Sequence, residues 1–148
     1  MKIKLVIFDV NQTMFSLSEI ERLFRINKLK KELVEVWFSS VLKEGFAYSL
    51  SGQYIDFFNI GINELKKIFL QNRKPFTKKL IDNIMKGFEN LEVHSDVKQS
   101  LKLLKKKKIK VVTLTNGSDE NTRKLLKSNG IDKYVERCFS INKIRLWK

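Results

Sequence analysis

The sequence predicts an α/β protein with a parallel β-sheet and a group of helices inserted after its first strand. Two apolar, β-branched stretches, at residues 2–8 and 110–115, are typical of buried strands in a parallel sheet. Between them the apolar residues follow helical spacing, and the last helix before residue 110 completes a crossover that is expected to be right-handed. These observations indicate one α/β core interrupted by a helical unit.

The residues after the first strand predict four helices. Their apolar periodicity covers about 18–26, 31–50, 56–69 and 75–88. Ser18 and Glu21 have the Ser-x-x-Glu spacing of a capping box, and Pro75 stands near the start of the fourth helix. We therefore expect a helical cap at residues 17–93, inserted into a core formed by residues 1–16 and 94–148.

The second part of the core predicts two more helices and a third strand. The patterns cover about 97–107, 118–128 and 137–141. Ser95 or Asp96 can cap the first of these helices, and Gly130 suits the left-handed position that follows the second. The sheet is therefore expected to contain three strands.

Length and composition indicate a single folded domain. The chain has 148 residues, of which 43% are hydrophobic, which is enough for a packed core. Its apolar runs are shorter than the roughly 20 residues of a membrane span, and its start lacks a signal-peptide pattern. We expect a cytoplasmic protein with no membrane partner. Because Cys138 is the only cysteine, an internal disulfide and a cysteine-based zinc site are excluded.

The net charge of +14 is the strongest compositional anomaly. Basic surfaces bind phosphate backbones, which would suggest a nucleic-acid partner. Lysine supplies 24 of the 30 basic residues, however, and isoleucine and asparagine, which also have A/T-rich codons, are abundant. Base composition explains this pattern without a ligand, so we do not expect a nucleic-acid partner.

A carboxylate directly after the first strand marks a candidate active site. In an open α/β sheet, ligands bind outside the carboxyl ends of the strands, where Asp9 and the hydroxyl of Thr13 follow the apolar run. Asp9 is therefore a candidate nucleophile. Asp and Asn also form turns after strands, so Asp9 and Asn11 could equally serve as turn residues. From these residues alone both interpretations stay open.

Four stretches of the sequence resemble the haloacid dehalogenase (HAD) superfamily, in particular its type II, (S)-2-haloacid dehalogenase-like branch. They are FDVNQTMF, VWFSSVLKEGFAYSLSGQYIDF, HSDVKQSLKLLKKKKIKVVTLTNGS and CFSINKIRLWK, in the order of the family. The resemblance implies an HAD-like Rossmannoid parallel sheet with an inserted α-helical cap.

The resemblance implies catalytic roles for four residues. Asp9 would attack the substrate carbon and displace halide, and water would then hydrolyse the aspartyl ester, which divides one difficult displacement into two easier steps. Thr13 and Thr115 would offer hydroxyls to Asp9 or to the substrate carboxylate. Lys148 matches the family's active-site lysine, a positive charge that orients the nucleophile.

Three further residues are expected to bind the substrate. The amide of Asn116 can donate a hydrogen bond to a developing halide or oxyanion, and Phe57 lies where the family closes an apolar wall over the leaving group. Asn11 follows the nucleophile within the same loop. Several of the candidate site residues have a structural alternative. Phe57 could be ordinary core, Thr13 and Thr115 could be strand-end hydroxyls that satisfy backbone groups, and Lys148 could be a solvated terminal side chain.

Asn11 separates two chemistries within the superfamily. Phosphatase members resemble Asp-x-Asp-x-Thr, in which the second carboxyl protonates the leaving oxygen and Mg²⁺ bridges the site. The amide of Asn11 cannot supply that proton, whereas halide leaves without one. No cofactor is therefore expected, and Mg²⁺ is implied only by the phosphatase alternative.

Phe38 is a departure from the family pattern that argues against haloacid dehalogenase activity. Type II dehalogenases that resemble this chain carry an arginine directly after the tryptophan of the second cap helix, where this chain has Phe38 after Trp37. Phe cannot replace the cation and donors of a guanidinium. Lys43 lies five positions further on and is expected to face elsewhere on the helix. Haloacid chemistry is thereby placed in question.

The family continues beyond its lysine with a further helix, an acidic fourth strand and a fifth strand, in the sheet order 5-4-1-2-3. This sequence ends at Lys148, so we expect three of the usual five strands and a truncated chain. Residues 2–8 would then form an apolar edge strand with unpaired backbone groups, open to a homodimer contact or a complementing chain.

We therefore expect an HAD-like hydrolase with an aspartate nucleophile. Its nearest activity is that of an (S)-2-haloacid dehalogenase acting on a 2-haloacid or similar small carboxylate. One alternative is a Mg²⁺-dependent small-molecule phosphatase of the same fold. Another is an inactive truncated remnant or a basic binding module.

Overall fold

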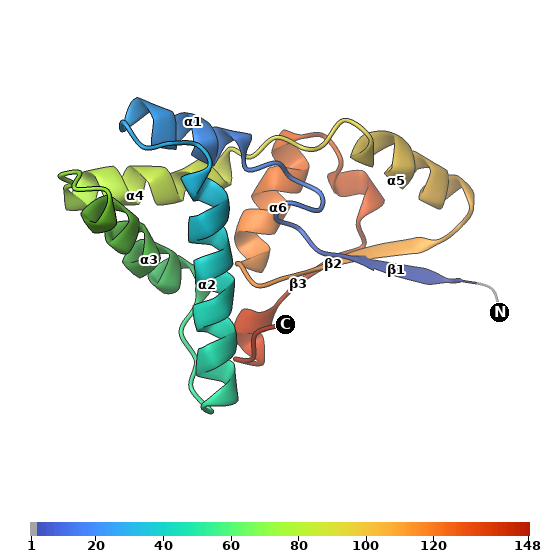
Figure 1. Cartoon of the computed structure of the whole chain (residues 1–148). Coiled ribbons are helices and arrows are strands. Elements are labelled where there is room, and N and C mark those ends of the chain that lie inside the picture. The colour runs from blue at the N-terminus through green and yellow to red at the C-terminus, as the bar shows by residue number, and fades with distance from the viewer. Residues whose placement is uncertain (1–2) are drawn as a thin grey trace.

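The computed structural model describes residues 3–148, which form a three-stranded sheet and a helical unit at one end of it (Figure 1). The elements are, in chain order, β1 (Leu5–Phe8), α1 (Ser18–Ile26), α2 (Leu33–Leu50), α3 (Phe57–Gln71), α4 (Lys78–Lys86), η1 (Gly87–Glu89), α5 (Val97–Lys106), β2 (Lys110–Thr115), α6 (Asp119–Ser128), η2 (Asp132–Tyr134), β3 (Arg137–Ser140) and η3 (Ile141–Lys143). The predicted α/β fold with four helices after the first strand is confirmed.

The sheet is parallel, with the strand order β1-β2-β3. Ile7 pairs with Val112, and Leu114 pairs with Phe139. Because all strands run in one direction, their carboxyl ends meet at one edge of the sheet, which is where ligands bind in open α/β folds. In Figure 1 the strands run from the N-terminus at the right toward α2 in the centre.

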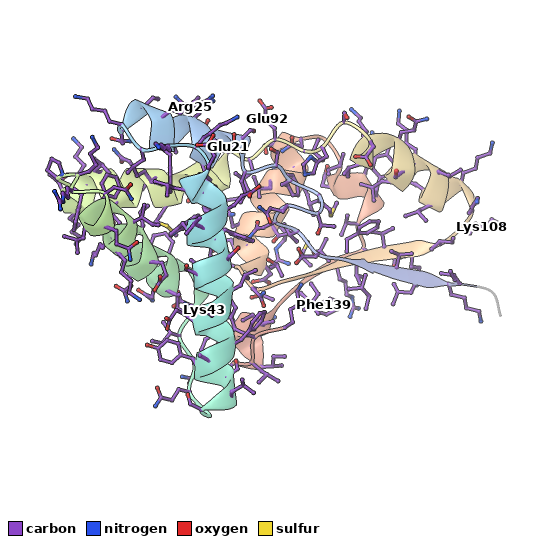
Figure 2. All side chains as sticks on the ribbon, in the orientation of Figure 1. Glu21, Arg25, Lys43, Glu92, Lys108 and Phe139 are labelled. Atoms are coloured by element: carbon purple, nitrogen blue, oxygen red, sulfur yellow. The ribbon has the colours of Figure 1, made fainter. Side chains whose placement is uncertain are left out.

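The two faces of the sheet differ in their covering. On one face, β2 buries Val111, Thr113 and Thr115, and α5 and α6 pack there (Figure 1). On the other face, Leu5, Ile7 and Phe139 are 46%, 59% and 45% exposed. No helix within residues 3–148 covers this face, on which Figure 2 labels Phe139. Parallel sheets normally bury both faces, so this apolar surface is unusual.

Trp37 on α2 organises the helical unit. Its ring is fully buried among other aromatic rings, with centroids 6.2 Å from Phe24 and 5.7 Å from Phe88, and its Nε1–H donates a 2.9 Å hydrogen bond to the carbonyl of Gly61. The indole therefore fixes α2 against α1, α3 and the segment after α4. The division into a cap at 17–93 and a core stays a prediction.

The prediction of a capping box at the start of α1 was wrong. The N-cap position is occupied by Leu17, and no side chain there accepts a capping hydrogen bond. The hydroxyl of Ser16 instead accepts a hydrogen bond from the Ser18 N–H at 3.0 Å. A hydroxyl that satisfies a backbone group two residues later is a common local alternative to a helix cap. Ser18 itself is already the first helical residue.

Other element boundaries differ by only a few residues. Asp96 occupies the N-cap position of α5, as predicted, although its side chain makes no capping hydrogen bond. The left-handed conformation predicted for Gly130 is confirmed, with φ +65°. The first strand begins at Leu5 rather than at residue 2; Lys2 lies outside the described residues. In the described part of the chain, each helix is too short or too polar to cross a bilayer.

Candidate active site

Asp9 lies just beyond the carboxyl end of β1, in a tight turn. The chain reverses there through hydrogen bonds from the N–H groups of Met14 and Phe15 to the carbonyl of Val10, and Gln12 adopts a left-handed φ of 62°. The buried Val10 and Met14 side chains anchor this turn in the core. The Asp9 side chain therefore leaves the turn at the edge where the strand ends meet.

The carboxylate of Asp9 is held at both oxygens. Lys148 donates from Nζ to Oδ1 at 2.6 Å, and the hydroxyl of Thr13 donates to Oδ2 at 3.1 Å. The Lys148 and Asp9 side chains are 31% and 39% exposed, so a small molecule can reach the pair. Asp9 binds a residue from the far end of the sequence, which a simple turn residue would not do.

Lys148 is fixed through its backbone rather than left mobile. Its N–H donates to Oδ1 of Asn116 at 3.1 Å, and Nδ2 of Asn116 donates to its carbonyl at 3.3 Å. Asn116 stands directly after β2. The interpretation of Lys148 as an unconstrained terminal lysine is thus contradicted by its contacts.

Trp147 docks the C-terminal segment against α2. Its backbone N–H donates to Oγ of Ser49 and its Nε1–H donates to the carbonyl of Ile55, both at 2.9 Å. The ring stacks on Phe57 at a centroid distance of 6.3 Å and lies against Gly45, where an added Cβ would come within 2.2 Å of it. Gly45 is thus required for close approach of the indole, which places Lys148 at the strand ends.

A small cavity of about 170 Å³ opens at Asp9. Residues from both strand ends, from α2 and α3 and from the C-terminus line it, namely Asp9, Asn11, Phe38, Leu42, Phe46, Phe57, Thr115, Asn116 and Lys148. In Figure 1 the C-terminus lies beside α2, close to the ends of the strands. The cavity therefore lies between the helical unit and the sheet.

Six of the seven residues proposed from the sequence line this one cavity, and the seventh, Thr13, binds Asp9. Thr115 is buried, and its Oγ1 accepts a hydrogen bond from the Gly117 N–H at 3.0 Å. This hydrogen bond stabilises the loop that follows β2. Asn116 holds Lys148. The individual roles in catalysis stay predictions.

Sequence reasoning missed the apolar lining contributed by α2. Phe38, Leu42 and Phe46 stand four residues apart, so they share one face of the helix, and all three line the cavity. This spacing was visible in the sequence, but a helical stripe of this kind is usually core. The contact of Trp147 with Gly45 left no signal in the sequence.

Lys43 faces away from the cavity, as predicted. It lies on α2, where Figure 2 labels it, and lines a separate surface hollow together with Glu35, Val36, Ser39 and Ser40. The Lys43 cation therefore does not replace the arginine that the family resemblance implies at the position of Phe38.

The donor set suits Mg²⁺ poorly. Among the residues lining the cavity Asp9 is the only carboxylate, and Lys148 occupies one of its oxygens. Hard divalent cations in proteins are held mainly by carboxylates and other oxygen ligands. Within residues 3–148 no three His, Cys, Asp or Glu side chains gather as a metal cluster. The residues that the structure describes therefore do not fit the metal of the phosphatase alternative.

Tyr54 joins the helical unit to the segment after β3. Its Oη donates a 2.6 Å hydrogen bond to Oδ1 of Asn142, and Arg145 lies over its ring. Burial raises the pKa of the Tyr54 hydroxyl, the negative charge of Asp56 raises this pKa further, and Arg145 lowers it. The neutral hydroxyl is therefore the favoured form at this contact.

A second hollow, of about 360 Å³, adjoins the first. The two share Asn11, Phe57 and Thr115, and the second extends between α3, η1 and the start of α6. It lacks Asp9 and Lys148 among its lining residues. The Asp9–Lys148 pair therefore belongs to the smaller cavity.

Comparison with known proteins shows the family of this chain. A model of the haloacid dehalogenase-like hydrolase family matches residues 3–148. The chain belongs to this family. Its sequence is 26% identical, over 113 residues, to (S)-2-haloacid dehalogenase 4A of Burkholderia cepacia, covering 76% of this chain and 49% of that protein.

A second HAD relative is (S)-2-haloacid dehalogenase 1 of a Pseudomonas strain, which is 22% identical over 99% of this chain and 65% of that protein. The structure of L-2-haloacid dehalogenase from Xanthobacter autotrophicus with chloropropionic acid covalently bound superposes with a TM-score of 0.87 at 21% identity, covering 99% of this chain and 60% of that one. That likeness shows the fold. The chain thus spans about half to two thirds of the length of these relatives.

Proposed function

We propose that this HAD family member hydrolyses a carbon–halogen bond in a small organic substrate, with Asp9 as the nucleophile. The observation that carries the proposal is the carboxylate of Asp9, held at 2.6 Å by Lys148 and at 3.1 Å by Thr13, at a small cavity that is lined by both polar and apolar side chains. Such contacts fix the direction of the carboxylate while leaving it open to a ligand.

The proposed reaction has two steps. A carboxylate oxygen of Asp9 forms a bond to the substrate carbon, and the halide leaves with the bonding electron pair. Water then adds to the carbonyl carbon of the ester; the alcohol departs with one proton of that water, the carboxylate is regenerated and one proton is released. Neither step requires an acid at Asn11, which is consistent with an amide at that position.

The curated relatives supply the nearest known activity, since both are named (S)-2-haloacid dehalogenases. A small-molecule substrate agrees with a cavity of about 170 Å³, well below the roughly 300–1,000 Å³ of sites for drug-sized ligands. The phosphatase alternative gains no support from a cavity with a single carboxylate.

Isotope labelling tests the nucleophile directly. The protein is incubated in H₂¹⁸O with (S)-2-chloropropionate and with neutral haloamides, and halide release is measured alongside the mass of the peptide that contains Asp9. Because water attacks the ester carbonyl, ¹⁸O is expected to accumulate in Asp9 over repeated turnovers.

Two substitutions serve as references for this experiment. Asp9→Asn is expected to abolish halide release, whereas Asp96→Asn, which changes an exposed carboxylate outside the cavity, is expected to leave it intact. Halide release without label in Asp9, or release that persists in Asp9→Asn, would overturn the assignment. No release from any substrate would favour the non-catalytic alternative.

A further inference from the structure

We infer that the cavity selects uncharged organohalides, such as short haloalkanes and 2-haloamides, over 2-haloacids, with Phe38 as the residue that sets this preference. The inference rests on the proposed function and narrows its substrate class. It follows from the lining of the cavity, the pairing of its one cation and the size of the space.

The part of the cavity lining that α2 and α3 contribute is apolar. Phe38, Leu42 and Phe46 form one stripe along α2, and Phe57 at the start of α3 faces it, with a centroid distance of 6.0 Å between Phe38 and Phe57. Phe38 is 7% exposed and packs beside the buried Trp37. The ring of Phe38 therefore has a fixed place in the wall.

Among the described residues that line the cavity, Lys148 is the only cation, and it is already paired. Nζ of Lys148 lies 2.6 Å from Oδ1 of Asp9, so the two charges compensate one another. A 2-haloacid would bring a second carboxylate next to Asp9 without a second cation among the lining residues. Like charges at short range repel one another, and no unpaired cation among the lining residues offsets this repulsion.

Neutral polar groups remain available for a neutral ligand. Asn11 contributes an amide to the lining, and Nδ2 of Asn116, which donates one N–H to the carbonyl of Lys148, has a second N–H; these groups can bind a carbonyl oxygen or a departing halide. The volume of about 170 Å³ suits a molecule of a few carbon atoms. An uncharged organohalide satisfies these constraints, and the bond changes are those of the proposed reaction.

Equilibrium binding of unreactive analogues tests the preference without relying on turnover. Isobutyramide and isobutyrate replace the chlorine of the corresponding 2-chloro compounds by a methyl group, and their binding to the unmodified protein can be followed by NMR titration. Isobutyramide is expected to bind at least about tenfold more tightly, because the acid alone brings a second carboxylate next to Asp9. Equal binding, tighter binding of isobutyrate, or no binding of either would overturn the inference.

Turnover measurements provide a second test of the substrate preference. With racemic 2-chloropropionamide and 2-chloropropionate, Asp9-dependent chloride release is expected to favour the amide by about tenfold or more in kcat/KM. Asp9-dependent release that favours the acid would overturn the substrate class while leaving the nucleophile in place. Absence of release from both compounds would count against the proposed function, and the binding experiment would still decide the preference of the cavity.

Substitutions identify the residue responsible. Phe38→Arg is expected to shift the ratio of isobutyramide to isobutyrate affinity toward the acid by about tenfold, since it adds a cation to the wall. Leu42→Lys, at a less buried position on the same stripe, gives the same test if Phe38→Arg fails to fold. Val36→Arg, which adds the same charge at a 53% exposed site outside the cavity, is expected to leave the ratio unchanged. An unchanged ratio in folded Phe38→Arg or Leu42→Lys protein would contradict the role of this wall.

Discussion

At the scale of single residues, the contact between Asp9 and Lys148 defines the candidate site. Neither residue is informative alone, because aspartate often forms turns and a terminal lysine is usually solvated. Their 2.6 Å contact joins the two ends of the sequence at the carboxyl edge of the sheet. A partly exposed pair of this kind contributes little to stability, so its importance lies in orientation of the carboxylate.

Lys148→Met tests that distinction. The substitution removes the charge while Trp147 and Asn116 still hold the backbone, so the free energy of unfolding is expected to change by less than about 1 kcal/mol. Asp9-dependent halide release is expected to fall on the order of 100-fold because the nucleophile loses its orientation. Halide assays and urea denaturation measure the two effects. Lys143→Met, at an exposed site outside the cavity, is the matched control, and equal rates for both variants would refute the role of Lys148.

Tyr54 carries a prediction for alkaline pH. Burial raises the pKa of its hydroxyl above the ordinary value of about 10, so the folded protein retains a proton that the unfolded chain loses. The corresponding stability is present below the unfolded pKa and is lost as pH rises through the folded one. Spectrophotometric titration is expected to show one tyrosine that ionises late, and Tyr54→Phe is expected to remove that step. Persistence of the late step in Tyr54→Phe would assign it to another tyrosine.

At the scale of elements, α2 performs two tasks through different positions. Trp37 fixes the helix within the helical unit, while Phe38, Leu42 and Phe46 line the cavity. Directly before Phe46, Gly45 leaves space for the ring of Trp147. The same helix therefore supplies the cavity wall and the docking surface that places Lys148.

Gly45→Ala is expected to disturb this docking. The new Cβ would meet Cδ2 of Trp147 at 2.2 Å, and overpacking of this kind costs about 1–3 kcal/mol in the free energy of unfolding. Displacement of Trp147 is also expected to lower Asp9-dependent turnover, because Lys148 follows it in the chain. Thermal denaturation and halide assays measure both losses.

A double-substitution cycle separates a steric clash from a general effect on helix α2. Trp147→Leu makes room for the added methyl group, so the Gly45→Ala and Trp147→Leu changes are expected to be non-additive in stability by at least about 0.5 kcal/mol. Strict additivity of the two changes would show that the contact between these residues is not the cause.

At the scale of the whole molecule, the uncovered face of the sheet is the main departure from a typical parallel α/β protein. Leu5, Ile7 and Phe139 expose apolar surface there, and β1 forms one edge of the sheet. Exposed apolar edge strands promote association between chains. The homodimer or complementing chain expected at this edge stays a prediction.

Replacing Leu5 and Ile7 together by lysine is expected to reduce self-association at high ionic strength, where repulsion between the basic chains is screened. Sedimentation velocity and light scattering measure the change, and the fold is expected to persist because the two side chains are already 46% and 59% exposed. Leu103→Lys, at a 52% exposed position on α5, is the control for added charge. Association that is unaffected by the double substitution would show that this face does not mediate it.

Much of this architecture could be predicted because its signals are local. Apolar alternation and helical spacing located the three strands and six helices to within a few residues. The capping box at Ser18 failed because Ser16 offers a competing hydroxyl two residues earlier. For the site, the strand-end position of Asp9 and the family resemblance brought forward residues that the structure places around one cavity.

The sequence by itself determined the elements, their parallel order and the chemical types of the candidate site residues, because hydrophobic periodicity and residue chemistry are properties of short segments. Only the tertiary structure decided that Asn116 binds Lys148, that Trp147 packs against Gly45, and that the stripe from Phe38 to Phe46 lines the same cavity as Asp9. These contacts depend on how α2 and the C-terminal segment pack against the strand ends, and such packing between distant segments leaves no local pattern in the sequence.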